Sequence, residues 1–394
     1  MTAVLLAFVL ILAPIPDGSF QVETLAGTGL PGHTDGEGAR FNMPQAVLVL
    51  PGGEVVVLDT FNNLVRKVSG NVTATLSGRV LDVDQFGFPN GYLFDGELGE
   101  SLFNRPIGGA VDSLGRILIA DSMNHSIRVI DGERSFTLAG SGKSGHVDGA
   151  SLDALFNHPS DVAFGPCGSL FVADSLNHVV RKIDIYGMVT TFAGVPGYYG
   201  FNDGELGEAL FNTPMGIAVN SYGVVFVSDT GNHLIRKIYG GIVTTFAGEV
   251  IFPDDVEWEF PGDFDEEPIG GFLDGERGRF NVPQGIFVME DILIVADAAN
   301  HRIRGIRQDG YVFTIAGTGE VGSTGGSLHE ATFHFPRGIY VHENTIFVAD
   351  TGNNQIRMIT ILSAEKKITF QRDLRLLTTE NTEKIWKMFS VASI

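Results

Sequence analysis

The stretch DSLNHVVR at residues 174–181 decides the fold, because its pattern occurs six times in the 394-residue chain. The pattern is Asp-x-x-Asn-(His or Asn)-x-x-Arg. Its copies begin at Asp59, Asp121, Asp174, Asp229, Asp297 and Asp350. Successive starts differ by 62, 53, 55, 68 and 53 residues, so the unit is about 53 residues long with insertions in two places. Self-similarity at a fixed period is the signature of a repeat architecture.

Each copy lies in the same arrangement of short apolar segments. A continuous apolar run precedes the Asp, as at residues 170–173, and predicts a strand covered on both faces. Upstream, Phe-Asn-x-Pro stands in five copies and Phe-His-Phe-Pro (333–336) in the sixth, each followed by another short strand. A strand after the Arg ends in Gly in five copies. Four antiparallel strands joined by tight turns predict one blade of a β-propeller.

The count of these last strands predicts how the ring closes. Five of them follow an Asp motif, whereas a sixth, VETLAG at residues 22–27, precedes the first blade. We expect it to pair beside the strand around residues 355–360 and to complete the last blade. The sequence therefore predicts an all-β, six-bladed β-propeller of four-stranded antiparallel blades, closed by the N-terminal strand.

The repeated residues resemble those of the NHL-repeat family of six-bladed β-propellers. The resemblance covers about residues 20 to 360 and consists of Asn-His-x-(Ile or Val)-Arg after an apolar strand, with Phe-Asn-x-Pro upstream. It implies the fold. It names no function, because the family includes protein-interaction modules, RNA-binding modules and a peptide-amidating lyase.

Composition limits the partners and the compartment. The formal charge of −21 makes a nucleic-acid partner unfavourable, and the single cysteine, Cys167, excludes an intrachain disulfide. The apolar run at residues 3–13 is too short to span a bilayer, so we expect residues 1–16 to be a signal peptide or apolar leader of a secreted or extracytoplasmic monomer. No other segment suits a transmembrane span. The propeller is predicted over residues 20–361, and residues 362–394 form a basic tail of unknown structure.

The repeated polar residues are interpreted as scaffold. The Arg seven residues after each Asp can reach back to that Asp, and Asp followed by Asn is turn chemistry. We expect the motif histidines (125, 178, 233 and 301) to lie one per blade on outer turns, apart from each other. A second repeat, Asp-Gly, as at Asp148-Gly149, predicts a β-turn, with calcium binding as the alternative.

Residues that differ between blades are the better candidates for a ligand site. Two positions follow each Pro at the channel rim, and the second is small and neutral in five blades but Asp161 in the third. The opposite blade carries Arg337, and His158 and His334 occupy the rim of these two blades. The predicted ligand-binding residues at the channel rim are Asp161, Arg337, His158, His334, Gln45 and Gln284.

Two insertions lengthen the loops between blades, at residues 79–93 and 249–272. The second is rich in carboxylates with interleaved aromatic residues, which suits a partner surface or a carbohydrate-stacking face. The predicted partner-binding residues are Trp258, Phe260, Asp263, Phe264 and Asp265.

We therefore expect a non-catalytic recognition propeller that binds a protein, peptide or glycan through its rim and this acidic-aromatic loop. The alternative is a metal-dependent lyase or hydrolase with its site in the central channel, for which Asp161, His158 and His334 are the nameable ligands. No cofactor is predicted, with calcium or zinc as the metals to consider.

Overall fold

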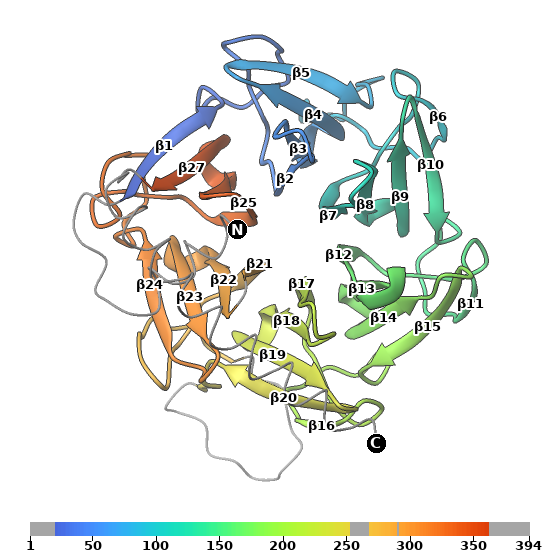
Figure 1. The fold of residues 1–394 in the computed structure, drawn as a ribbon. Helices are drawn as coiled ribbons and strands as arrows, with labels where there is room; N and C mark the ends of the chain where they lie inside the picture. Colours follow the sequence, from blue (N-terminus) through green and yellow to red (C-terminus); the bar gives the residue numbers. More distant parts are fainter. Residues whose placement is uncertain (1–19, 253–267, 290, 362–394) are drawn as a thin grey trace, which may run out of the picture.

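A computed structural model of the chain describes residues 20–252, 268–289 and 291–361. Six antiparallel sheets stand around a central channel like the blades of a propeller (Figure 1). The innermost strand of each blade lines the channel and the outermost lies at the periphery. The predicted fold is confirmed.

In blades 1 to 5 the main strands follow one another outward in chain order, and in blade 6 the N-terminal β1 takes the outermost place. Blade 1 consists of β2 (Ala46–Val49), β3 (Val55–Asp59), β4 (Leu64–Ser69) and β5 (Val72–Ser77). Blade 2 consists of β7 (Pro106–Val111), β8 (Ile117–Asp121), β9 (Ser126–Asp131) and β10 (Arg134–Ala139). Blade 3 consists of β12 (Pro159–Phe164), β13 (Leu170–Asp174), β14 (Val179–Ile183) and β15 (Met188–Ala193).

The second half of the ring repeats this order. Blade 4 consists of β17 (Pro214–Val219), β18 (Val225–Asp229), β19 (Leu234–Tyr239) and β20 (Ile242–Ala247). Blade 5 consists of β21 (Pro283–Met289), β22 (Ile292–Asp297), β23 (Arg302–Arg307) and β24 (Val312–Ala316). Blade 6 consists of β25 (Pro336–His342), β26 (Thr345–Asp350), β27 (Gln355–Ile361) and the N-terminal β1 (Phe20–Ala26).

Three blades have a fifth strand that the sequence does not predict. The two-residue strands β6 (Gly96–Glu97), β11 (Gly149–Ala150) and β16 (Gly204–Glu205) pair with the outer edges of blades 2, 3 and 4. Each begins at the Gly of an Asp-Gly turn, so this turn also caps the blade edge.

The N-terminal strand closes the ring as predicted. β1 pairs antiparallel with β27 from Phe20↔Ile361 to Ala26↔Ile356, so the two ends of the propeller share one sheet. This pairing joins the first and last segments of the array and leaves no unpaired terminal repeat.

The hydrophobic core lies between blades rather than within them. One cluster combines Leu118 and Ala120 of blade 2 with Val162 and Val172 of blade 3, and the fully buried Phe156 packs among them. Every blade is thus covered on both faces, which explains the continuous apolar runs.

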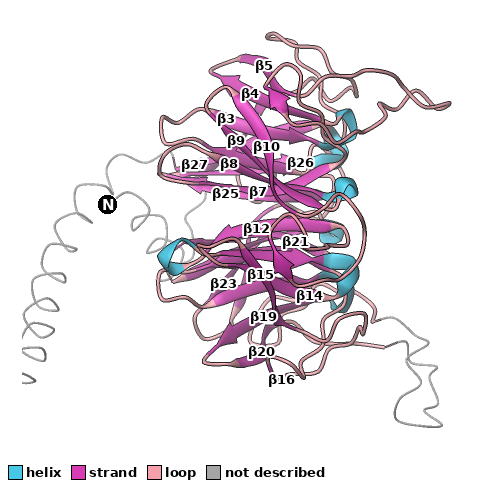
Figure 2. Ribbon diagram, turned by 90° about the vertical axis from the view of Figure 1, so that its right-hand side faces the viewer, coloured by secondary structure: helices cyan, strands magenta, loops and turns pink. Residues whose placement is uncertain are grey.

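Six short 3₁₀ helices lie on one face of the ring, which we call the rim face (Figure 2). They directly follow the motif Asp of each blade, and the residue after each helix is a motif His or Asn with left-handed backbone geometry. They are η1 (Thr60–Asn62), η2 (Ser122–Asn124), η4 (Ser175–Asn177), η5 (Thr230–Asn232), η6 (Ala298–Asn300) and η7 (Thr351–Asn353). A seventh, η3 (Pro166–Gly168), lies between β12 and β13.

No helix in these described ranges has the length and apolar character needed to cross a membrane.

Candidate functional site

The motif Asp and Arg form the buried centre of each blade. In blade 3, Asp174 Oδ2 accepts hydrogen bonds from Asn177 Nδ2 and Arg181 Nη1, both at 2.8 Å, and Oδ1 accepts one from the Asn157 amide at 2.7 Å. Burial raises the pKa of Asp174 to about 6, and these three donors oppose that rise, so the carboxyl is ionised at neutral pH. All six blades contain this ion pair, at 2.6 to 3.2 Å. The scaffold interpretation is confirmed.

The Asp-Gly repeat supplies a second carboxylate to the same arginine. Asp148 Oδ1 accepts from Arg181 Nη2 at 2.7 Å, and Oδ2 accepts from the Thr191 amide at 2.9 Å. Burial alone would raise the pKa of Asp148, but the Thr191 amide and Arg181 hold it below its usual value. Four other blades repeat this pair. In blade 6, where the Asp is missing, Arg357 Nη2 keeps the hydrogen bond to a backbone carbonyl, that of Thr324, which the other blades also have. The Asp-Gly carboxylates thus position the blade arginines.

The motif His or Asn connects one blade to the next. His178 Nδ1 accepts a hydrogen bond from the Thr213 amide of blade 4 at 3.1 Å, and His125 does the same for the His158 amide at 3.2 Å. In the two blades with Asn, the side-chain oxygen takes this role: Asn63 Oδ1 accepts from the Arg105 amide at 2.8 Å. The motif histidines lie one per blade, as the sequence predicts. Their hydrogen bonds to the next blade were not predicted. The alternation of His with Asn is the signal that could have shown this, because both offer an acceptor at the same place.

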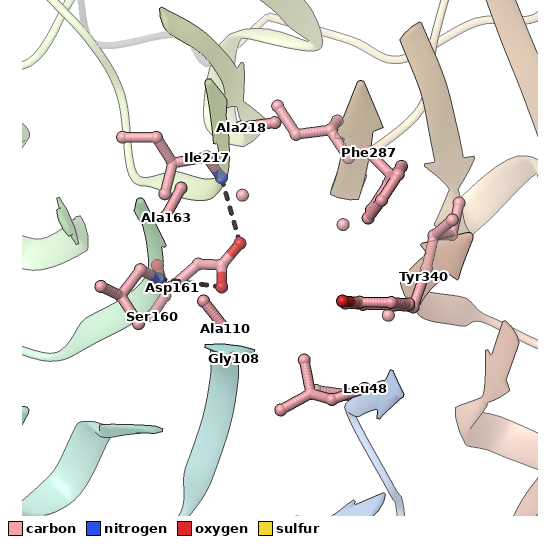
Figure 3. A pocket seen from close by; sticks show the side chains of 18 of the residues that line it. Leu48, Gly108, Ala110, Ser160, Asp161, Ala163, Ile217, Ala218, Phe287 and Tyr340 are labelled. Carbon is pink, nitrogen blue, oxygen red and sulfur yellow. Dashed lines mark hydrogen bonds between the residues drawn. The ribbon is translucent and has the colours of Figure 1, made fainter. Parts of the chain in front are cut away.

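The innermost strands enclose a channel cavity of about 220 Å³ that all six blades line. Asp161 at the start of β12 points into it, with Tyr340 directed inward from the opposite side (Figure 3). Asp161 Oδ1 accepts from the Val162 amide at 2.9 Å and Oδ2 from the Ile217 amide at 3.1 Å, and a third backbone donor is Gly109. Burial raises the pKa of Asp161 to about 7, and these donors oppose the rise. This carboxylate ties together three adjacent inner strands.

The small residues at the equivalent position of other blades have a steric cause. A Cβ on Gly216 would lie 2.3 Å from the Gln284 carbonyl oxygen of the next blade, and one on Gly285 would lie 2.3 Å from that of Arg337. A Cβ on Gly108 would lie 2.5 Å from Asp161 Oδ1. Asp161 is thus the exception among positions that are otherwise Gly or, in blade 1, Ala46.

Arg337 lines the same cavity from blade 6, opposite blade 3. Its Nη1 donates to Gln45 Oε1 of blade 1 at 2.9 Å, while its Nε is buried without a partner in the part of the chain described. Burial lowers the pKa of Arg337, and no acidic side chain of the described residues lies within 4 Å of its guanidinium. Gln284, from the blade on its other side, also lines the cavity.

The structure separates the predicted rim residues into two groups. Asp161, Arg337, Gln45 and Gln284 line the one cavity. His158 and His334 lie instead where two neighbouring blades meet, which we call a seam. The centre of the His158 ring is 5.1 Å from that of His125, and the centre of the His334 ring is 5.9 Å from that of His301. The predicted loop residues Trp258, Phe260, Asp263, Phe264 and Asp265 fall outside the described residues.

The other insertion forms a hairpin on the rim face. Val83 pairs with Pro89, and Asp84 Oδ1 accepts from the amides of Phe86 and Phe88 at 2.8 and 2.9 Å. The hairpin is attached to the ring by Asn63, whose Nδ2 donates to the Pro89 carbonyl at 2.8 Å. Phe86, at the tip, is 74% exposed. The sequence analysis identified this insertion but assigned it no role. Its aromatic residues were the feature that could have indicated a binding surface.

A groove of about 600 Å³ lies between this hairpin and the rim of blade 1. The rings of Phe61 and Phe88 meet edge-on at its wall, with centroids 6.2 Å apart, and the Arg105 guanidinium lies 3.6 Å from the Phe61 ring centre. Further lining residues include Pro31, His33, Met43, Val83 and Pro89.

Six small antiparallel blades around a ligand-sized channel define the class of six-bladed β-propellers. Residues 103–130 and 211–238 match the model of the NHL repeat. The chain is an NHL-repeat protein. NHL repeat-containing protein 2 of Gallus gallus is 30% identical over 368 residues, which cover 83% of this chain and 48% of that protein.

A second relative is much longer than this chain. The chloroplastic protein SUPPRESSOR OF QUENCHING 1 of Arabidopsis thaliana is 31% identical over 247 residues, 55% of this chain and 22% of that protein. The chain thus spans about half the length of the chicken relative and about a fifth of the plant one.

Solved structures share the fold at low sequence identity. A protein of unknown function from Bacteroides thetaiotaomicron aligns with a TM-score of 0.62 and 20% identity over 86% of this chain and 76% of that chain. An auxiliary nutrient binding protein from Bacteroides ovatus aligns with a TM-score of 0.62 and 14% identity over 88% of this chain and 77% of that one.

Proposed function

We propose that this chain is a non-catalytic recognition propeller that binds an extended segment of a protein partner on its rim face. The observation that carries this proposal is the aromatic hairpin beside the groove. Large apolar side chains gather on the insertion and its flanks with 39 to 74% of their surface exposed. These side chains are Leu81, Val83, Phe86, Phe88, Tyr92, Leu93 and Phe94. Contiguous exposed apolar surface on a folded protein marks an interaction site.

The hairpin is held in place by hydrogen bonds and is therefore suited to binding. Asp84 fixes the turn, and Asn63 and Asn124 hold the segment that returns to the ring through the carbonyls of Pro89 and Tyr92. A loop that is already in its bound conformation loses little entropy on association. Phe86 is thereby presented to solvent without the cost of ordering the segment around it.

Charge favours a partner segment that carries Lys or Arg beside apolar side chains. The chain has a net charge of −21, and the hairpin itself contains Asp82 and Asp84. Apolar side chains of the partner would enter the groove and pack against Phe61 and Phe88, and its basic groups would be attracted by the negative charge of the propeller. A glycan stacked on the aromatic rings is the competing ligand.

The lyase or hydrolase alternative has no comparable support. This alternative needs His158 and His334 beside Asp161 in the channel. Neither histidine lines the channel cavity.

The test is a selection of phage-displayed random peptides on the immobilised chain, followed by affinity measurement of synthetic peptides by fluorescence polarisation. We expect Phe86→Ser to weaken binding about tenfold or more, as loss of an interface anchor does. Tyr186→Ser is the matched control, because Tyr186 is 88% exposed in the turn between β14 and β15.

Peptides that bind the Phe86→Ser chain as tightly as the unmodified chain would overturn the proposal. The proposal would also be overturned if glycans on an array bound the chain through Phe86 while binding of the selected peptides did not depend on Phe86.

A further inference from the structure

The channel cavity contains two opposite charges that the fold leaves without counter-ions. The six blade arginines each bond a carboxylate, whereas Arg337 has no carboxylate within 4 Å among the described residues. Within the described part of the chain, Asp161 likewise bonds only backbone amides. Asp161 and Arg337 are both half-buried, and a charge that is partly withdrawn from water without a counter-charge is costly, so two of them on facing blades of one cavity favour an external partner.

We propose that the channel cavity binds a small zwitterion, with its ammonium group at Asp161 and its carboxylate at Arg337. A carboxylate has about four acceptor sites, and backbone amides occupy three of those on Asp161. One acceptor site therefore remains for an ammonium group. The Arg337 guanidinium has five donors, of which one bonds Gln45 and its buried Nε bonds none of the described residues.

Much of the remaining cavity lining is apolar and limits what the body of the ligand can be. Leu48, Ile217 and Phe287 line the cavity, with Tyr340 beside Phe287 (Figure 3). The Phe287 and Tyr340 ring centres are 5.1 Å apart. A hydrocarbon chain between the two charged ends would cover these side chains, so the ligand class is an amino acid with its ammonium and carboxylate separated by apolar atoms.

This site is distinct from the rim-face groove. The cavity and the groove share no lining residue, so either can fail without the other. The ligand also differs, being a small molecule in one case and a protein segment in the other.

The experiment titrates the full chain with 4-aminobutanoate, 6-aminohexanoate and 8-aminooctanoate by isothermal calorimetry. Hexylamine and hexanoate are the controls that carry one charge each. We expect one member of the series to bind at least tenfold tighter than either control. Asp161→Asn should reduce its affinity at least tenfold and leave hexanoate unaffected, whereas Arg337→Gln should reduce the affinity for both the zwitterion and hexanoate.

Matched variants separate the site from general charge effects. Asp153→Asn and Arg134→Gln remove the same charges from exposed positions outside the cavity and should leave affinity unchanged. If Asp161→Asn fails to fold, as judged by circular dichroism, the Arg337→Gln arm still decides. Phe86→Ser should not affect zwitterion binding, which keeps this result independent of the rim-face proposal.

Protonation gives a second readout. The other titratable groups that line the cavity are Arg337 and Tyr340, and neither changes charge near neutral pH. Because burial raises the pKa of Asp161 to about 7, zwitterion affinity should fall as the pH drops below about 7.

Three results would overturn the proposal. These are the absence of binding for every ω-amino acid at about 10 mM, equal affinity for the singly charged controls, and affinity that neither cavity substitution changes.

Discussion

Aspartate and arginine occur in two places in the molecule, inside each blade and in the channel, and their roles differ. Six Asp–Arg ion pairs lie inside the blades, whereas Asp161 and Arg337 line the channel. In the blades, Arg181 is fully buried and bonds two carboxylates, Asp174 and Asp148. In the channel, Asp161 and Arg337 come from facing blades, and no ion pair joins them. The charges that repeat in every blade neutralise each other, whereas Asp161 and Arg337 have no side-chain counter-charge among the described residues.

The largest effect should follow removal of a blade arginine. Arg181→Met leaves Asp174 and Asp148 without their cation, and breaking a buried pair in this way costs about 3–5 kcal/mol. We expect the free energy of unfolding, measured by urea denaturation, to fall by this amount. Lys143→Met, which removes a positive charge from an exposed position, should change it by less than about 0.5 kcal/mol. Equal losses in both variants would refute the scaffold role of the pair.

A smaller effect is expected at the seams between blades. His178→Leu removes the acceptor for the Thr213 amide, and an unsatisfied buried donor costs about 1–3 kcal/mol. His178→Asn keeps an acceptor, as Asn63 and Asn354 do in their blades, so it should cost clearly less. Urea denaturation of the two variants compares them directly. If Asn destabilises the protein as much as Leu, the His side chain matters for packing and not for its acceptor.

The seam histidines also predict a dependence on pH. Burial lowers the pKa of His178 in the folded chain, whereas the unfolded residue titrates near 6.5. Unfolding therefore takes up a proton below pH 6.5, and the stability that His178 contributes is present above that pH and is lost as the pH falls. The loss is at most about 1.4 kcal/mol per pH unit.

The measurement is the difference in unfolding free energy between the unmodified chain and His178→Asn at about pH 7.5 and about pH 5.5. This difference isolates His178 from the buried aspartates, whose raised pKa values act with the opposite sign. We expect the advantage of His178 over Asn to shrink at the lower pH. An advantage that is constant or grows would contradict a neutral acceptor at Nδ1.

Most of the fold could be predicted from the sequence because every blade repeats the same residues. The closing strand was predictable because one copy of the fourth strand, at the N-terminus, had no Asp motif before it. The hydrogen-bond partners of His178 and Asp148 could not be predicted, because they depend on distances between segments that no local sequence pattern encodes.

The channel residues could be found only as departures from the repeat. Asp161 stood out where other blades have Gly or Ala, and Arg337 stood out on the opposite blade. Their lack of counter-ions could not be predicted, since Arg337 bonds Gln45 across the closure of the ring, 292 residues away in sequence. His158 occupies an equally distinctive place in the sequence, yet its backbone amide donates a hydrogen bond to His125 of the neighbouring blade.

The most direct test of this account is the free energy of unfolding of Arg337→Gln, measured together with its affinity for the ω-amino acids. We predict that Arg337→Gln unfolds with a free energy within about 1 kcal/mol of that of the unmodified chain, because no carboxylate loses its cation, and that it no longer binds the zwitterion. A fall of about 3–5 kcal/mol, as expected for Arg181→Met, with binding unchanged would show that Arg337 is part of the scaffold.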